Sequence, residues 1–427
     1  MKLLWFHLMP YADLPPDFPE ENRSVWVDID PELFDPAKCQ QMYNDYLDEL
    51  EHAAAAGFDG ICVNEHHSNG YGLMPSPNLW AASLARNTTD AAIVVLGNSL
   101  ALYNPPIRVA EEMAMIDVVS GGRLVAGFPV GTPMDTCYAY GLDPSTLRDR
   151  YQEAHDLIMK AWTSTEPFTF NGNYTKLRSV NIWPRPLQQP HPPVWIPGGG
   201  SVETWEWCAE MDYVYCYLSY YGWKLARKQM QGFWSKVDEL GLDPNPYRSG
   251  FTQFIGLADT DEEAYELYRE PAEYFFHRCL HVHGGYAEPP GYKTEATIRQ
   301  GVASQVEMAA KQAEQAKKPK PGSKAAIHSV TFEDMVERGW VLIGSPTTVA
   351  EKLHDIATEL NCGHMMLLMH FGNMSRELAM HNTTLFAEKV LPEVGDLFDD
   401  QWEDHWWPQG ARDRAALTPA GAAGGGT

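Results

Sequence analysis

The sequence predicts a closed (β/α)8 barrel, and two observations lead to this fold class. Short apolar runs alternate with amphipathic stretches along most of the 427 residues, and such alternation is typical of a parallel sheet covered by helices. Eight of the runs have the length of strands, and eight strand–helix units are the number that closes a barrel. An open, doubly wound sheet gives the same alternation, so it stays as the alternative.

The first half of the chain supplies four predicted strands and the helices between them. Residues 39–57 form an amphipathic stretch that ends in glycine, and residues 105–122 have an early proline and a final Gly-Gly, the usual asymmetry of a helix. Two more helices are predicted at 78–86 and 147–162. The four strands are predicted at 2–8, 60–67, 91–102 and 123–131.

The second half returns to the same rhythm after one interruption. Asn171 and Gly172, inside residues 168–177, predict a β-hairpin, because Asn-Gly between apolar residues is a strong turn signal. After a proline-rich connector, the remaining elements are strands at 193–201, 213–220, 250–258 and 364–372, and helices at 345–360 and 376–390.

Two segments do not fit the repeat. Residues 281–330, between the seventh and eighth strands, include the lysine-rich and proline-interrupted "KQAEQAKKPKPGSK", and long irregular insertions in a barrel are usually lids or disordered loops. Residues 396–427 end in small residues and predict a C-terminal extension that is mobile from about residue 410. We therefore expect one barrel domain over residues 1–395, with 281–330 as its lid-like insertion.

Composition favours an enzyme that acts on small molecules in the cytoplasm. Acidic residues exceed basic ones by 57 to 32, a formal charge of −25, which opposes nucleic-acid binding. The seven cysteines are dispersed without a CxxC pair, as expected of reduced thiols. The N-terminus lacks the features of a signal peptide, and no run approaches the roughly 20 apolar residues of a membrane span.

Polar residues gather where several predicted strands end, which is where barrel active sites lie. The apolar run from Gly60 ends in Glu65, His66 and His67. Strand alternation points the two histidines in opposite directions, which opposes a shared metal ion. A neutral imidazole suits proton transfer near pH 7, but both rings could equally form hydrogen bonds within the barrel rim. The other strand ends carry Asn98 and Ser99, residues 198–201, and His370.

Two further motifs have a possible chemical use. "PGGGS" before a helix lets the backbone approach an anion at the helix N-terminus, although it also suits a plain tight turn. "HRCLHVH" brings together His277, Cys279, His281 and His283, but no carboxylate follows at ligand spacing, so we expect solvated or lid histidines there and no metal. No GxGxxG, GxxxxGK[ST], GxSxG or HExxH motif occurs.

Several stretches together resemble the bacterial-luciferase-like flavin monooxygenases. These are "GFDGICVNEHHSNGYG", "PPIRVAEEMAMIDVVSGGRLVAGFPVG", "PPVWIPGGGS" and the ending "LIGSPTTVAEKL…HMMLLMHFGNM…LFAEKVLPEV", in order over residues 1–395. The resemblance implies a (β/α)8 barrel that binds reduced FMN from a separate NAD(P)H:flavin reductase. It also implies reaction with O2 to a flavin C4a-hydroperoxide, which oxygenates a small organic substrate.

The resemblance also assigns roles to particular residues. It makes His66 the residue that handles protons near the flavin, with His67 and Glu65 supporting it, and it places a non-prolyl cis peptide beneath the flavin ring at the end of the third strand. Cofactor contacts are expected from Asn98, Ser99 and Leu100 at the ring and from Gly199, Gly200 and Ser201 at the phosphate.

One departure from the family concerns the phosphate. The family pattern places a Cys-Arg pair after "GRLVAGF", and here these positions are Pro129 and Val130. Arg108 or a lysine of the insertion is the expected substitute. The lysines in question, which could also draw an anionic flavin into an acidic protein, are Lys311, Lys317, Lys318 and Lys320.

Three other functions remain open. A deazaflavin-dependent dehydrogenase shares the fold, but Glu-His-His favours FMN. A barrel zinc hydrolase needs an HxH on the first strand, where this chain has only His7, and a non-catalytic subunit would not need His66. The sequence does not identify the substrate or its reaction, and a homodimer is expected from the resemblance. Aromatic residues that could line a substrate pocket are Tyr103, Phe128 and Phe371, with Trp195 and Tyr217.

Overall fold

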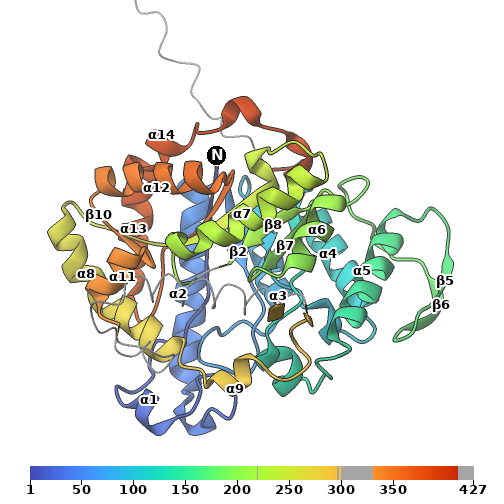
Figure 1. The fold of residues 1–427 in the computed structure, drawn as a ribbon, viewed down its shortest axis with the longest axis horizontal. Helices are drawn as coiled ribbons and strands as arrows, with labels where there is room; N and C mark the ends of the chain where they lie inside the picture. Colours follow the sequence, from blue (N-terminus) through green and yellow to red (C-terminus); the bar gives the residue numbers. More distant parts are fainter. Residues whose placement is uncertain (219, 296–297, 300–329, 412–427) are drawn as a thin grey trace, which may run out of the picture.

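The computed structural model describes residues 1–218, 220–295, 298–299 and 330–411 and shows a closed barrel of eight parallel strands inside a layer of helices (Figure 1). Each strand pairs in parallel with the next along the chain, and the last pairs with the first. The barrel strands are β1 (Lys2–Phe6), β2 (Gly60–Val63), β3 (Ala92–Val95), β4 (Leu124–Gly127), β7 (Val194–Gly198), β8 (Val214–Tyr217), β9 (Ser249–Leu257) and β11 (His364–Leu368). The predicted fold class is confirmed, and the open-sheet alternative is wrong.

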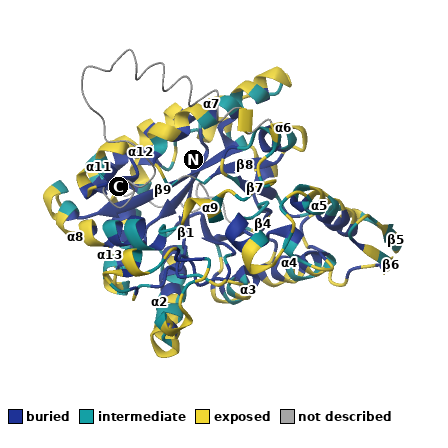
Figure 2. Ribbon diagram, turned by 60° about the horizontal axis from the view of Figure 1, so that its bottom comes forward, coloured by how far each residue is buried: buried dark blue, intermediate teal, exposed yellow. Residues whose placement is uncertain are grey.

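Strand β9 shows how the barrel closes. Its first half pairs with β8 and its second half with an additional strand, β10 (Val341–Gly344), which the sequence analysis did not count. Nearly every residue of the barrel strands is buried (Figure 2), because side chains on one face fill the barrel while those on the other pack under helices. Parallel strands of this kind are continuous apolar runs in the sequence, which is why their positions could be predicted.

The helices alternate with the strands as predicted. The long helices are α2 (Pro36–Ala55), α3 (Pro77–Asn87), α4 (Ile107–Ser120), α5 (Leu147–Thr163), α6 (Val202–Glu210), α7 (Trp223–Glu239), α8 (Asp261–Tyr274), α12 (Pro346–Leu360) and α13 (Arg376–Lys389). The short ones are α1 (Phe18–Glu21), α9 (Gly284–Ala287), α11 (Phe332–Arg338) and α14 (Leu391–Val394). None of the helices in these described parts is both long and apolar enough to cross a membrane.

The predicted hairpin is present as β5 (Phe168–Asn171) and β6 (Lys176–Val180), which extend away from the barrel (Figure 1). The carboxylate of Glu153 on α5 closes its turn by accepting the backbone N–H groups of residues 173–175. A Cβ at Gly172 would lie only 2.4 Å from that carboxylate, so glycine is required. The hairpin is thereby tied to the helix layer, away from the strand ends that carry the polar residues.

The two ends of the barrel are closed differently. At the amino-terminal end, the segment after α14 packs against the strands, and Trp195 Nε1 donates to the carbonyl of Trp406 at 3.1 Å. At the carboxyl-terminal end, the described start of the insertion lies over the mouth: Ser24 and Val282 form an isolated bridge, and Tyr292 donates to the Gly131 carbonyl at 2.6 Å. The four lysines singled out above, and residues 412–427, lie outside the described residues.

The strands end earlier than the sequence predicted, and this places the polar residues in loops. Strand β2 ends at Val63 and β3 at Val95, so Glu65 to His67 and Asn98 to Ser99 follow the ladder. Beyond the last ladder bonds, the backbone turns and its side chains face the barrel mouth. The predicted boundaries at 67 and 102 are therefore too long.

Candidate active site

His66 forms a close pair with a carboxylate that the sequence analysis missed. Its Nδ1 lies 2.8 Å from Oδ2 of Asp135, and the edges of Trp26 and Tyr71 pack against its ring. Because an ionised carboxylate only accepts hydrogen bonds, Nδ1 carries the proton and Nε2 keeps its lone pair in the neutral ring. The side chain of His66 is 13% exposed, so one edge of the ring remains accessible.

Asp135 lies in the π-helical segment Met134–Ala139 that follows β4. It also accepts the Trp26 indole N–H and the His67 backbone N–H, each at 2.8 Å. Burial alone would raise the pKa of this carboxyl, but the neighbouring His66 and these N–H donors lower it below its usual value. Asp135 is therefore an ionised group that fixes the orientation of His66.

Glu65 joins the end of β2 to the end of β3. One oxygen accepts the Ser99 backbone N–H at 2.6 Å, and the other accepts the Tyr103 hydroxyl at 2.8 Å and lies 3.1 Å from His67 Nε2. Burial and the charge of Glu65 raise the pKa of Tyr103, so its hydroxyl stays protonated and donates. Asn98 donates to that hydroxyl at 2.7 Å, while its own Oδ1 is buried without a partner.

The predicted non-prolyl cis peptide at the end of the third strand is absent. The cis bonds of the described chain all precede proline, at residues 105, 184 and 190. The bonds around Asn98, Ser99 and Leu100 are trans, and the Ser99 N–H is directed to Glu65. The prediction was wrong, although these residues do lie at the barrel mouth.

His67 is occupied on both ring nitrogens. Nε2 faces Glu65, and Nδ1 lies 3.4 Å from the Tyr140 hydroxyl, whose ring packs at 4.6 Å. The two histidines point to different carboxylates, although they lie beyond the end of β2, where strand alternation does not apply. His66 has the free ring edge, whereas His67 holds the loop together.

The glycine loop "PGGGS" meets an arginine that the sequence analysis also missed. Arg148, in the first turn of α5, donates from Nη2 to Ser201 Oγ at 3.0 Å, and its Nε is buried without a partner. Ser201 in turn donates to Glu203 at 2.7 Å. Arg108, which the sequence analysis offered as a phosphate ligand beside the lysines of the insertion, is 71% exposed and pairs with Glu112 on its own helix.

The loop itself leaves room for a ligand. A Cβ at Gly199 would meet no atom within 4 Å, and Gly200 has φ +96°, which only glycine adopts readily. Ser201 is the residue before α6, and the Thr204 N–H of the first turn donates to the Ser201 carbonyl at 3.1 Å. The unpartnered Nε of Arg148 is the donor that an anion would meet here, and the Glu203 carboxylate, which accepts the Ser201 hydroxyl, lies beside it.

The aromatic residues predicted for a substrate pocket do not gather in one place. Tyr103 belongs to the Glu65 network, but Phe128 stacks on Trp162 beneath α5, and Phe371 packs against Phe254 and Tyr268. These two phenylalanines are core residues. Trp195 lies at the opposite end of the barrel, and Tyr217 stacks on Phe251.

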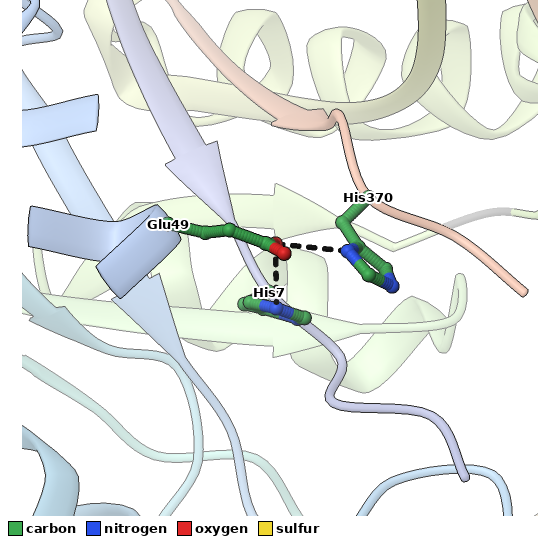
Figure 3. Close-up of side chains that lie close together, drawn as sticks. All are labelled: His7, Glu49 and His370. Carbon is green, nitrogen blue, oxygen red and sulfur yellow. Dashed lines mark hydrogen bonds and ion pairs between the residues drawn. The ribbon is translucent and has the colours of Figure 1, made fainter. Parts of the chain in front are cut away.

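A second histidine–carboxylate cluster lies buried between the barrel and α2 (Figure 3). Glu49 extends from α2 toward His7, which follows β1, and His370, which follows β11. Its Oε2 lies 3.3 Å from His7 Nε2 and 2.8 Å from His370 Nδ1. Potential ligand atoms of the three side chains lie within 4.8 Å of one another, so the group raises the question of a metal ion.

The tautomer of His7 opposes metal binding at this cluster. His7 Nδ1 accepts the Met9 backbone N–H at 2.9 Å, so the neutral ring carries its proton on Nε2, the atom that faces Glu49. A metal ion on Nε2 would move that proton to Nδ1, against the Met9 N–H. Burial lowers the pKa of His7 to about 4, and the three residues form a hydrogen-bonded group around one buried carboxylate.

The histidines of "HRCLHVH" bind separate backbone groups. His277 and His281 lie 3.0 and 2.7 Å from the carbonyls of Val330 and Asn22, and His283 accepts the Gly285 N–H. The His281 contact connects the start of the insertion to the segment after β1, whereas the His277 contact reaches Val330 and the His283 contact is local. They give each of the three rings a structural role.

Comparison with known proteins identifies the family. The profile described as luciferase-like monooxygenase matches residues 30–360. An uncharacterized protein of Sinorhizobium fredii is 25% identical over 361 residues, which cover 83% of this chain and 93% of that one. The oxygenase component of a flavin-dependent trigonelline monooxygenase of Acinetobacter baylyi is 29% identical over 164 residues, 37% of this chain and 43% of the relative.

Solved structures of similar fold include two cofactor complexes. The oxygenating constituent of 3,6-diketocamphane monooxygenase of Pseudomonas putida, in complex with FMN, has a TM-score of 0.65 at 19% identity and covers 92% of this chain and 98% of its own. An F420-dependent secondary alcohol dehydrogenase has a TM-score of 0.59 at 16% identity, with 92% and 98% covered. At these identities the likeness shows the fold alone.

Proposed function

The chain belongs to the luciferase-like monooxygenase family, and we propose that it is the oxygenase component of a two-component system. In this proposal a separate NAD(P)H:flavin reductase supplies reduced FMN, and the protein uses it with O2 to oxygenate a small organic substrate. The observation that carries the proposal is the His66–Asp135 pair at the mouth of the barrel, and the contact of Arg148 with the glycine loop supports it. The trigonelline monooxygenase relative named above is itself an oxygenase component, which supports the proposal that a separate reductase serves this protein.

The residues at the mouth fit a flavin nucleotide at two places. Arg148 would hold the phosphate, and Gly199 leaves the space that it needs. Asn98, with its unpartnered buried Oδ1, would accept an N–H of the flavin ring. These contacts orient the cofactor and require no metal ion.

The chemistry divides between the cofactor and the protein. When bound, reduced flavin supplies the electrons that activate O2. His66 holds or passes on a proton at Nε2, because Asp135 keeps the Nδ1 proton in place. Asp135 also stabilises the imidazolium form, so the ring can take up a proton without moving. Glu65 and Tyr103 fix the adjoining loop, and the surrounding aromatic rings exclude water from one side of His66.

A deazaflavin-dependent dehydrogenase is the second candidate function, because an enzyme of that type shares the fold. The two candidates differ in what they do with O2 and in which cofactor they bind. Both cofactors carry a phosphate, so the Arg148 site does not separate them. The two cofactors differ in the flavin or deazaflavin ring, so only contacts with that ring can distinguish them.

Anaerobic titration with each reduced cofactor tests the proposal. Reduced FMN should bind at micromolar concentration, and Arg148→Ala should weaken it by at least about tenfold, the loss of one charge-assisted hydrogen-bond pair. Arg150→Ala, on the same helix and stacked on Tyr174, is the matched control and should leave the affinity unchanged. Tight binding of reduced F420 without binding of FMN would contradict the FMN assignment.

The proposal includes a homodimer formed through α3 and α4. These helices pack together and expose four large apolar side chains, Leu79, Met115, Val118 and Val119. Exposed apolar patches of this kind often mark protein–protein contacts. Light scattering should give twice the chain mass of 48.0 kDa, and Val118→Asp should yield a monomer.

A further inference from the structure

A cavity of about 390 Å³ is lined in part by His66 and by no residue of the glycine loop. Its walls come from the loop after β1, the 3-10 turn Pro31–Leu33, and the loop that follows His67. The volume suits a small organic molecule. Because His66 forms part of the wall, a molecule in the cavity would lie next to the ring edge that Asp135 leaves free.

The lining of the cavity is largely apolar. Leu14, Ile29, Leu33 and Phe34 contribute side chains without hydrogen-bonding groups. The described lining includes no lysine or arginine, and its one carboxylate belongs to Asp30. An anionic ligand would therefore lose its hydration without gaining an ion pair.

Three polar side chains of the lining are already paired within the protein. The Tyr11 hydroxyl donates to the Leu33 carbonyl at 3.0 Å and accepts the Asp35 N–H at 2.9 Å. Tyr43 donates to the Leu73 carbonyl at 2.8 Å, and Asn69 bonds to His67 and Gly72. A ligand would meet mostly carbon surface, with His66, the exposed Ser68 and the Asp30 carboxylate as the polar groups of the wall.

We propose that this cavity holds the substrate, and that the substrate is an uncharged, mainly apolar compound whose reacting group faces His66 Nε2. This inference rests on the proposed function for the role of His66. It goes further by selecting a substrate class. The apolar wall disfavours carboxylates, sulfonates and other anions, and the negatively charged Asp30 in the wall repels them as well.

Equilibrium dialysis with two ligands of matched shape tests the selection. 2-Acetylnaphthalene and 2-naphthoate differ in that a neutral acetyl group replaces a carboxylate. The neutral ketone should bind at least about tenfold more tightly, because the cavity offers the carboxylate no partner. Equal or tighter binding of 2-naphthoate would overturn the substrate class.

Substitutions in the wall test the location. Leu33→Asp places a charge in the cavity and should weaken ketone binding by at least about tenfold. If that variant does not fold, Leu33→Trp fills the space and should weaken binding without adding charge. Leu225→Asp, at an exposed leucine of α7 outside the cavity, is the control. Unchanged ketone binding in a folded Leu33 variant would show that the ketone binds elsewhere.

A chemical probe tests the contact with His66. Diethyl pyrocarbonate modifies accessible imidazoles, and the rate at each histidine can be followed by mass spectrometry. Saturating 2-acetylnaphthalene should slow modification of His66 but not of the exposed His354. An unchanged rate at His66 would contradict the inference. None of these measurements uses flavin or O2, so their outcome does not depend on whether the proposed monooxygenase function is correct. Failure of the cavity proposal would likewise leave the flavin titration unaffected.

Discussion

Two histidine–carboxylate clusters lie at neighbouring strand ends of this barrel, and they differ in access. In the first, Asp135 orients His66, whose ring keeps a free edge beside a cavity. In the second, Glu49 lies between His7 and His370, and all three side chains are at most 1% exposed. The first arrangement can exchange a proton with a ligand, whereas the second cannot reach one. We therefore propose that similar residues serve chemistry in one place and stability in the other.

The clusters also differ in how visible they are in the sequence. Glu65, His66 and His67 are contiguous and end an apolar run, so the motif can be recognised in the sequence alone. The residues of the sealed cluster come from strand ends and a helix, and His370 and Glu49 are separated by 321 positions. The sequence gives no sign that they meet. If the contrast is correct, substitutions in the open cluster should change activity, and those in the sealed cluster should change stability.

The largest expected effect is on turnover in the open cluster. His66→Ala removes the accessible proton carrier and should lower turnover by about 10² to 10⁴-fold. Its melting temperature should fall little, because the ring makes one hydrogen bond and keeps one edge free. His354→Ala, at an exposed histidine, is the control. Steady-state oxygenation of an accepted substrate and differential scanning calorimetry measure the two quantities, and a large stability loss with unchanged turnover would reverse the comparison.

In the sealed cluster the effect should fall on stability. Glu49→Ala leaves two buried N–H donors without their acceptor and should cost about 3–5 kcal/mol of unfolding free energy. Turnover per folded molecule should stay within about threefold, since the cluster has no access to a ligand. Glu51→Ala, on the same helix and facing Asn87 at the surface, is the matched control and should cost less than about 0.5 kcal/mol. Urea unfolding followed by circular dichroism measures both.

The sealed cluster should also make stability depend on pH. Burial lowers the pKa of His7 from 6.5 to about 4. Burial alone would raise the pKa of Glu49, but the neighbouring His370 and His7 lower it from 4.5 to about 2. As the pH decreases, the unfolded chain binds a proton at each of these groups at a higher pH than the folded chain does. The free energy of unfolding therefore falls between about pH 6.5 and pH 2.

His7 should account for the upper part of that window, between about pH 6.5 and 4, with an effect on the order of 3 kcal/mol. Melting temperatures measured from pH 8 to pH 4 should fall less steeply in His7→Gln than in the unaltered protein. His354→Gln should leave the slope unchanged. Equal slopes in all three proteins would show that His7 is not buried in its neutral form.

The extent to which this molecule could be predicted follows from where its contacts lie in sequence. The eight barrel strands are buried on both faces and are therefore continuous apolar runs, so their order was predictable. Strand β10 was missed because it is an extra strand outside the eightfold repeat and pairs with only the second half of β9. The fold depends on local patterns repeated eight times, which one sequence displays directly.

The site was predicted in part for the same reason. The Glu-His-His motif is local, but Asp135 is 69 positions from His66, and nothing marks it except an acid shortly after the fourth strand. Arg148 belongs to "LRDRYQEAHD", where it has the appearance of an ordinary charge on an amphipathic helix. Its role emerges only when α5 meets the glycine loop.

The smallest expected effect concerns a carboxylate near that loop. Burial would raise the pKa of Glu203, but hydrogen bonds from Thr294 and Ser201 lower it to about 2, so the group is ionised at neutral pH and opposes a bound phosphate. Glu203→Gln should tighten binding of reduced FMN by about threefold at low salt, and less at high salt. Anaerobic titration at two ionic strengths measures this. Weaker binding in the variant would show that Glu203 positions the loop instead of repelling the ligand.

Stopped-flow absorbance tests the central claim most directly. The purified protein is mixed first with reduced FMN and then with oxygenated buffer, and the spectrum is followed until the flavin is fully oxidised. We predict a long-lived absorbance distinct from both reduced and oxidised flavin, which His66→Ala shortens or abolishes while Glu49→Gln, measured in the folded state, leaves it intact. Direct oxidation without such a phase, or equal persistence in His66→Ala, would contradict the assignment of proton chemistry to the open cluster.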